Sequence, residues 1–237
     1  MIRRVRHATT YAYRQPVRFG EHHMMVRPRD SHDLRLIEAT LSLSPRASVR
    51  WRHDVFNNSI ATAEFGDAMA SELRIESNIV IDHFGVEGPK FPIEPMARTL
   101  PFSYLAEEVP DLGRTIERHY PDPARKLDAW TSQFLNPSGP TDTDVFLRVL
   151  TEAIKAQFHY EGREEYGVQS PVETLERGSG TCRDFALLMM EAARSIGLAA
   201  GFVTGYLYSP PAETDGGQMV GAGATHAWAQ VYLPGAG

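Results

Sequence analysis

Residues 178–188 read G-S-G-T-C-R-D-F-A-L-L and contain Cys182, the only cysteine of the 237-residue chain. The two glycines allow a sharp turn, and Ser179 or Thr181 suits the capping position of a helix that begins at Cys182. Unsatisfied amides and the dipole of a first helical turn favour a negative charge, so a thiolate there is a competent nucleophile. The same amides can donate to a developing oxyanion. This stretch therefore predicts a reactive thiol at a helix N-terminus.

A histidine further along the chain supplies a matching base. Residues 225–233 read T-H-A-W-A-Q-V-Y-L, and their alternation predicts a strand with His226 and Trp228 on one face. If the helix that begins at Cys182 packs across this strand, His226 can take the thiol proton and later protonate the leaving amine. A histidine satisfied by hydrogen bonds within a strand is the alternative, and the glycine-flanked cysteine favours the catalytic interpretation.

One helix and two strands are predicted around these residues. The helix that begins at Cys182 ends before Gly197, which supplies a C-terminal stop. Strands are expected over 200–208 and 225–233. The Gly-rich loop that joins them, residues 209–224, is expected to be a mobile lid, a substrate wall or a plain hairpin connection. The buried helix face is expected to comprise Phe185, Leu188, Met189, Ala192 and Ile196.

The preceding sequence predicts a separate β-rich domain and a connection. Alternating apolar residues and turn signals over residues 1–85 predict short strands in an antiparallel, β-sandwich-like domain. Four prolines between Gly85 and Pro101 predict an extended linker, so residues 86–120 are assigned to a Pro-rich linker and connection. Residues 121–237 are assigned to the catalytic core.

Two helices are expected early in this core. Asp122-Pro123 is expected to open the first, with Leu127, Trp130 and Phe134 on one face. The second is expected to run from about Thr141 or Asp144 to Phe158. Its apolar stripe is expected to comprise Val145, Val149, Leu150 and Ile154.

Composition limits the classes of function. The net charge of -6 and the pI near 5.8 argue against a nucleic-acid partner, because phosphate binding needs clustered Lys and Arg. No secretory signal and no run of roughly 18 apolar residues is visible, so a cytoplasmic protein without a membrane partner is expected. A lone cysteine excludes disulfides within the chain and zinc sites built from several cysteines.

Three sequence blocks together resemble a known family. G-x-G-x-C-R-D-F-A, then R-S-I-G-L with G-F-V-T-G-Y, then T-H-A-W-A-Q-V-Y-L-P-G are similar to the core of the bacterial transglutaminase-like superfamily, over residues 158–237. The β-rich N-terminal part resembles the domain that often precedes this core in bacterial members. The resemblance implies an α+β chain with a papain-like core, in which a nucleophile helix packs on antiparallel strands. It also implies a Cys-His-Asp triad, with Cys182 as nucleophile and His226 as base.

The resemblance also suggests supporting residues. Gly180 and Thr181 belong to the turn before the nucleophile, and Asp184 matches an acidic position of the family for which we favour a helix-stabilising role. Tyr160, in F-H-Y, matches a common aromatic near the active site and is expected either to donate to the oxyanion or only to pack. Trp228 is expected to support the histidine strand.

The chain departs from the family pattern at its end. In this family the triad Asp follows the histidine strand, whereas this chain stops at Gly237. We therefore expect a truncated core that lacks its third triad residue and shows reduced or absent turnover, since His226 then lacks an orienting carboxylate. Asp215 is a weakly supported substitute.

The expected reaction acts on amide bonds of peptides or proteins through a thioester acyl-enzyme. Hydrolysis, as in a protease or amidase, is favoured over protein cross-linking, and no cofactor, calcium or other metal is expected. A non-catalytic binding or scaffold protein with a relic papain-like domain is an alternative. A metal-dependent hydrolase that uses His22, His23 or His7 is disfavoured, because adjacent strand residues point to opposite faces. The sequence predicts no oligomeric state.

Overall fold

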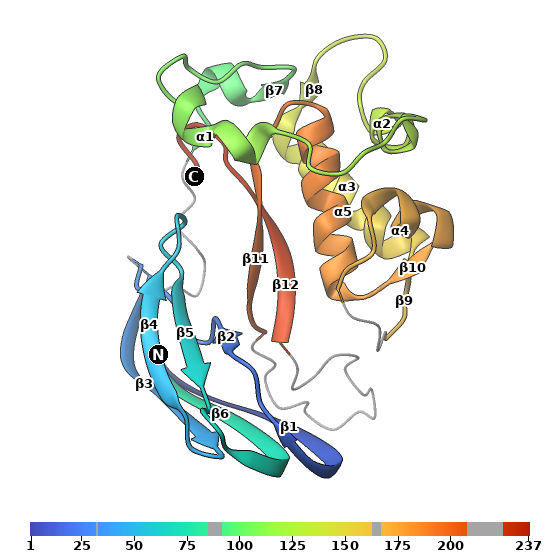
Figure 1. The fold of residues 1–237 in the computed structure, drawn as a ribbon. Helices are drawn as coiled ribbons and strands as arrows, with labels where there is room; N and C mark the ends of the chain where they lie inside the picture. Colours follow the sequence, from blue (N-terminus) through green and yellow to red (C-terminus); the bar gives the residue numbers. More distant parts are fainter. Residues whose placement is uncertain (32, 85–91, 163–166, 208–224) are drawn as a thin grey trace, which may run out of the picture. The chain divides into compact units, whose positions relative to one another are not determined.

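The structure is a computed structural model that describes residues 1–31, 33–84, 92–162, 167–207 and 225–237. The chain forms two compact units, Met1–Pro89 and Lys90–Gly237 (Figure 1). The N-terminal unit is built from antiparallel sheets, and the C-terminal unit combines helices with short sheets. The predicted α+β class is therefore confirmed.

The N-terminal unit contains two antiparallel sheets of three strands each. The first has the order β1 (Ile2–Arg18), β6 (Met69–His83), β3 (Leu34–Ser44). The second has the order β2 (His22–Met24), β5 (Ser59–Glu64), β4 (Ser48–His53). One hydrophobic cluster joins residues of both sheets, among them Leu73 of β6 and Ala61 of β5, both fully buried. The two sheets therefore enclose one core, as predicted for a sandwich-like domain.

The C-terminal unit has five helices and several short strands among its described residues. The helices are α1 (Val109–Ile116), α2 (Lys126–Ser132), α3 (Thr143–Gln157), α4 (Pro171–Arg177) and α5 (Cys182–Ser195), with a 3-10 turn η1 (Pro95–Ala97). The short strand pairs are β7 (Thr99–Leu100) with β8 (Thr141–Asp142), and β9 (His159–Tyr160) with β10 (Ser179–Gly180). The longer strands β11 (Ala200–Tyr206) and β12 (Thr225–Val231) form an antiparallel pair.

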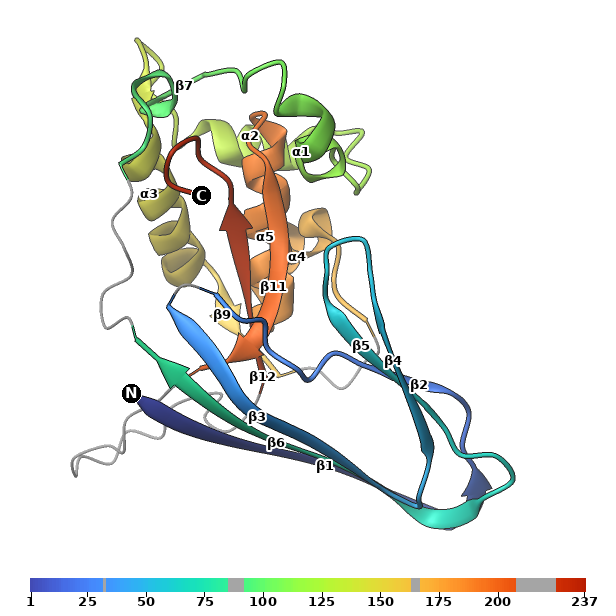
Figure 2. The ribbon, with the colours of Figure 1, turned by 90° about the vertical axis from the view of Figure 1, so that its left-hand side faces the viewer.

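Helix α5 lies at the centre of this unit. It packs against β11 and β12 on one side and contacts α2, α3 and α4 elsewhere (Figure 2). Neighbours on several sides explain why its buried surface is wider than the predicted stripe: Leu187, Met190 and Ala193 are buried, whereas Phe185 and Met189 are only partly so. The predicted start at Cys182 agrees with the structure.

The expected linker is shorter than the sequence suggested. Residues 92–120 belong to the C-terminal unit and contain η1, β7 and α1, so the assignment of the whole range 86–120 to a linker is corrected. Pro95 occupies the first position of η1, where a missing amide is tolerated. Part of the predicted linker, residues 85–91, lies outside the described residues.

Helix α2 begins later than expected. The chain turns at 122–125, where Arg125 adopts a left-handed conformation, and regular helix starts at Lys126. Asp122 nevertheless caps this helix, because its carboxylate accepts from the backbone amides of Lys126 and Leu127, both at 2.9 Å. Arg125 is the N-cap residue, so the prediction that Asp122-Pro123 opens this helix is wrong, although the Asp122 carboxylate still satisfies two amides of the first turn.

Helix α3 has the predicted extent, and its buried stripe is shifted. Asp142 caps it by accepting from the amide of Val145 at 2.9 Å. Phe146, Leu150 and Ile154 are buried, whereas Val145 is 42% exposed and does not belong to the stripe.

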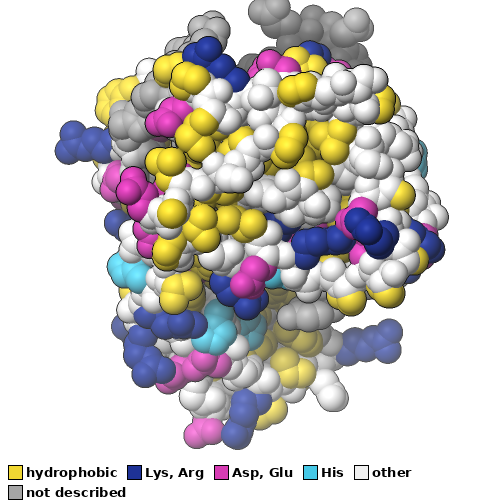
Figure 3. All heavy atoms as spheres, turned by 90° about the horizontal axis from the view of Figure 1, so that it is seen from above, with side chains coloured by type: hydrophobic (Ala, Val, Ile, Leu, Met, Phe, Trp, Pro, Cys, Tyr) yellow, Lys and Arg dark blue, Asp and Glu magenta, His cyan; other side chains and the backbone are white. Residues whose placement is uncertain are grey.

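Helix α1 lies at the surface and has no buried residue. Viewed from above, apolar side chains gather over the middle of the visible face, with charged side chains around them (Figure 3). Among the described residues, no helix is long and apolar enough to cross a membrane.

Candidate active site

Cys182 is the first residue of α5, and the turn before it is fixed by Asp184. The Asp184 carboxylate accepts from the amide and the hydroxyl of Thr181, both at 2.8 Å, and from the amide of Gln169 at 2.7 Å. Its side chain is fully buried. Asp184 therefore holds the turn before Cys182 in place by accepting these hydrogen bonds.

Gly180 is required by this arrangement. A β-carbon at residue 180 would lie 2.9 Å from Cβ and 3.3 Å from Oδ2 of Asp184. Side chains do not approach this closely, so only glycine leaves room for the capping carboxylate. The G-T-C-R-D sequence is thus one packed unit in which each position depends on its neighbours.

Tyr160 lies beside the same turn. Strands β9 and β10 run parallel and pair Tyr160 with Gly180. Backbone hydrogen bonds from His159 to Gly178 at 2.8 Å and from Glu161 to Gly180 at 2.9 Å hold the two segments together. Tyr160 is 41% exposed and lies beside the turn before Cys182.

Chain direction brings His226 to the Cys182 end of α5. The chain reverses at Gly197, and the carbonyl of Ala200 at the start of β11 accepts from Arg194 near the end of α5 at 2.7 Å. Strand β12 is antiparallel to β11, with Val231 opposite Ala200 and His226 opposite Gly205.

The lengths of the two elements agree with this placement. The strand from Val231 back to His226 covers about 17 Å at ~3.4 Å per residue. The helix from Arg194 back to Cys182 covers about 18 Å at ~1.5 Å per residue. Both elements therefore begin at the same end of the helix–sheet layer (Figures 1 and 2).

The ring of His226 is held by Trp228. The two side chains leave β12 on the same face, and their rings meet edge to face with centroids 4.8 Å apart. A β-carbon at Gly205, opposite His226, would lie 3.4 Å from the Trp228 ring, an ordinary van der Waals contact. Within the described part of the chain, the structure records no hydrogen bond between Cys182 and His226. The opposite face of β12, which includes Ala229 and Val231, packs on the α5 core, so His226 and Trp228 leave the strand on the face turned away from α5. The structure thus brings His226 to the Cys182 end of the helix but does not pack its ring against α5.

A buried ion pair anchors the far end of α5. Arg194 donates to Glu191 at 2.9 Å and also to the carbonyls of Thr115 and Ala200. Glu191 accepts in addition from the amide of His119 at 3.2 Å. Because the side chains of Arg194 and Glu191 are only 5% and 0% exposed, this network fixes the direction in which α5 meets the strands.

Three tyrosines near β11 and β12 have shifted pKa values. Burial raises the pKa of Tyr104, whose hydroxyl accepts from the amide of Ala199 at 2.8 Å. Burial also raises the pKa of Tyr206. A hydrogen bond to Glu108 raises the pKa of Tyr232. All three shifts favour the neutral phenol.

The other histidines named from the sequence have local partners. His7 lies 3.2 Å from the Thr9 hydroxyl, His22 lies 2.9 Å from the Gly20 carbonyl, and His23 contacts Glu21 and Thr62. Among the described residues, no group of three or more His, Cys, Asp or Glu side chains could hold a metal ion. Asp215 and the loop 209–224 lie outside the described residues.

Two family models match the chain. One, described as the bacterial transglutaminase-like N-terminal region, matches residues 3–82, and the other, for the transglutaminase-like superfamily, matches residues 132–237. Residues 132–237 therefore match the transglutaminase-like superfamily. The described part of this transglutaminase-like core contains Tyr160, the Cys182 helix and the His226 strand.

Curated relatives and one solved structure align with most of the chain. Uncharacterized proteins of Mycobacterium tuberculosis and Mycobacterium bovis are each 29% identical over 240 residues, which covers 98% of this chain and 73% of each relative. The crystal structure of a "Putative Cysteine Protease" from Cytophaga hutchinsonii superposes with a TM-score of 0.66 at 14% identity. That match covers 99% of this chain and 76% of the other. It shows that the two chains have the same fold.

Proposed function

We propose that this chain is a thiol enzyme that acts on amide bonds of peptides or proteins, with Cys182 as nucleophile and His226 as base. The observation that carries the proposal is the placement of Cys182 at the start of a buried, capped helix and of His226 at the same end of the adjacent strand. The turn before Cys182 is held by the hydrogen bond from Thr181 to Asp184, for which Gly180 leaves room, and this turn keeps the thiol in place.

The proposed reaction uses these residues in sequence. The Cys182 sulfur attacks the amide carbonyl carbon while His226 accepts the thiol proton. The carbonyl oxygen then carries negative charge, and first-turn amides of α5 and the Tyr160 hydroxyl are the proposed donors to it. When the C–N bond breaks, His226 returns the proton to the leaving amine, and a thioester to Cys182 remains. Trp228 keeps the imidazole oriented through both transfers.

Water is the proposed acceptor of the acyl group. It attacks the thioester carbon while His226 accepts a proton from it; the C–S bond then breaks, His226 returns the proton to the Cys182 sulfur, and the carboxylic acid is released. The name of the Cytophaga hutchinsonii protein supports hydrolysis over cross-linking. An amine acceptor would give transamidation through the same thioester, so the two outcomes are separated by product analysis with and without an added primary amine.

The rate of Cys182 alkylation by iodoacetamide across pH 4–10 tests the catalytic pair. We expect rapid alkylation below neutral pH in the wild type and a shifted, slower profile in His226→Ala. His53→Ala is the matched control, because His53 is exposed and lies in the N-terminal unit. A profile that rises only above ~8.5, the ordinary thiol pKa, and is unchanged by His226→Ala would favour the non-catalytic binding protein instead.

A further inference from the structure

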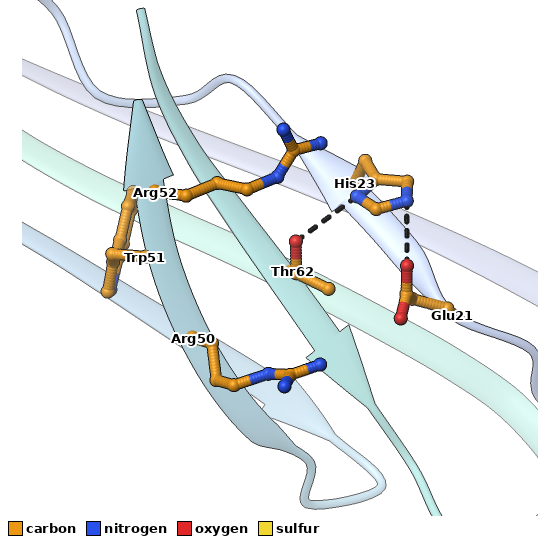
Figure 4. Close-up of a pocket in the computed structure, with 6 residues that line it drawn as sticks. All are labelled: Glu21, His23, Arg50, Trp51, Arg52 and Thr62. Carbon is orange, nitrogen blue, oxygen red and sulfur yellow. Dashed lines mark hydrogen bonds and ion pairs between the residues drawn. The ribbon is translucent and has the colours of Figure 1, made fainter. Parts of the chain in front are cut away.

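The N-terminal unit has a hollow of about 500 Å³ on the sheet β2-β5-β4. Its lining residues are Glu21, His23, Arg50, Trp51, Arg52 and Thr62 (Figure 4). None of these residues takes part in the proposed chemistry of Cys182, so the hollow is a separate feature of the molecule.

The strand register explains how the polar lining converges. Thr62 of β5 pairs with His23 of β2 on one side and with Arg50 of β4 on the other, so the three share one face. Arg52, two residues after Arg50, lies on that face as well. Thr62 is 6% exposed and forms the floor, while the Arg52 side chain reaches across β5 toward His23 and the Arg50 side chain ends over β5 (Figure 4).

The imidazole of His23 is held in a fixed orientation. Its Nε2 lies 2.8 Å from a carboxylate oxygen of Glu21, and its Nδ1 lies 3.1 Å from the hydroxyl of Thr62. A carboxylate only accepts, so Nε2 carries a hydrogen, and in the neutral ring the Thr62 hydroxyl donates to Nδ1. His23 therefore forms a firm wall of the hollow.

The positive charges of the hollow are not equally compensated. Arg50 forms an ion pair with Glu64. Arg52, by contrast, makes no recorded hydrogen bond or ion pair to any residue that the structure describes. Its guanidinium has its hydrogen-bond donors directed over a polar floor, which is an arrangement that suits a planar anionic group.

We propose that this hollow binds a single carboxylate carried by a polypeptide, with Arg52 as its principal partner and Arg50 as the second. Glu21 and Glu64 border the two arginines, and their negative charges disfavour a multiply charged ligand such as a nucleic acid or a phosphorylated group. A monovalent carboxylate can accept two parallel hydrogen bonds from one guanidinium. Trp51, between the two arginines on β4, leaves the strand on the opposite face and is no part of the proposed carboxylate contact (Figure 4).

Calorimetric titration of the whole chain with an alanine-glutamate-alanine peptide, acetylated and amidated at its ends so that it carries one carboxylate, tests this site. We expect measurable binding that weakens as salt is added, and a loss of about tenfold in affinity in Arg52→Gln. The alanine-glutamine-alanine peptide should not bind. Arg46→Gln is the matched control, because it removes the same charge from an exposed position of the same unit and should leave the affinity unchanged.

Several outcomes would overturn the proposal. These are equal affinity of Arg52→Gln and Arg46→Gln for the peptide, binding of the glutamine peptide, or tighter binding of inorganic phosphate than of the peptide. Arg52→Lys provides a second readout, since it keeps the charge but loses the two-pronged geometry and should bind with intermediate affinity. Circular dichroism of each variant establishes that the sheet is intact. Alkylation of Cys182 should be unchanged in all of them, so this test is independent of the proposed catalysis.

Discussion

Gly180 and Asp184 are packed so closely that a β-carbon at residue 180 would lie 2.9 Å from Cβ of Asp184. Gly180→Ala must therefore displace the carboxylate that caps α5. We expect it to lower the free energy of unfolding by about 1–3 kcal/mol, as for other overpacked sites. We also expect slower alkylation of Cys182, because the turn that holds the thiol is disturbed. Urea unfolding and iodoacetamide kinetics provide the two measurements.

Gly201→Ala is the control for this prediction. Gly201 lies in β11, and no neighbouring atom lies within 4 Å of the position its β-carbon would take. This variant should keep or slightly raise the stability, since glycine within a strand costs backbone entropy. If both variants behaved alike, close packing against Asp184 would not be the reason for a glycine at residue 180.

The buried pair of Arg194 and Glu191 should be costly to break. Arg194→Leu leaves the fully buried Glu191 without its cationic partner and removes hydrogen bonds to two carbonyls. We expect a loss of about 3–5 kcal/mol in the free energy of unfolding. Arg148→Leu breaks a surface ion pair with Glu152, in which the two side chains are 57% and 64% exposed. It should lower the free energy of unfolding by less than ~0.5 kcal/mol. Similar losses in the two variants would contradict the structural assignment.

Asp122 should make stability depend on pH in the acid range. Burial acts to raise the pKa of Asp122, but hydrogen bonds from the amides of Lys126 and Leu127 and from Arg118 outweigh it, and the net pKa is lowered. The carboxylate therefore stabilises the native state above its unfolded pKa of about 3.9, and this contribution is lost as the pH falls through the lower folded-state value.

Asp122→Asn measures that contribution. The variant should be less stable than the wild type by about 1 kcal/mol above pH ~5. The difference should shrink as the pH falls below ~4, because the wild-type carboxyl then becomes neutral as well. Denaturant titrations at several pH values measure it, and a difference that stayed constant down to the acid limit would exclude Asp122 as the source.

The sequence was sufficient for the elements that carry strong local signals. The start of α5 was predicted because glycines, a capping residue and an apolar run coincide at Cys182. The strand of His226 was predicted because its residues alternate. Helix α4 was missed although its signal was present: Ser170 and Glu173 form a capping box around Pro171.

Other elements depend on tertiary contacts that no local pattern reveals. Strand β5 reads S-I-A-T-A-E, and its alanines are fully buried only because a second sheet covers them. The pairing of Tyr160 with Gly180 arises from a parallel contact between segments far apart in sequence. In the same way, Arg52 joins Thr62 and His23 on one face only because β4 pairs with β5 in this register. Long-range register therefore accounts for most of what the sequence left undetermined.

Tyr160 allows the oxyanion step to be separated from thiol reactivity. Acylation of Cys182 by p-nitrophenyl acetate passes through a negatively charged tetrahedral oxygen, whereas alkylation by iodoacetamide does not. Because Tyr160 pairs with Gly180 beside the nucleophile turn and is 41% exposed, its hydroxyl is our proposed donor to that oxygen. We expect Tyr160→Phe to slow acylation by about 100-fold, near the lower end for loss of one such donor, and to leave alkylation unchanged.

The p-nitrophenolate burst and the alkylation rate, measured on the same preparation, give the comparison. Equal slowing of both reactions would mean that the hydroxyl supports the turn itself, and no change in either would assign Tyr160 to packing alone.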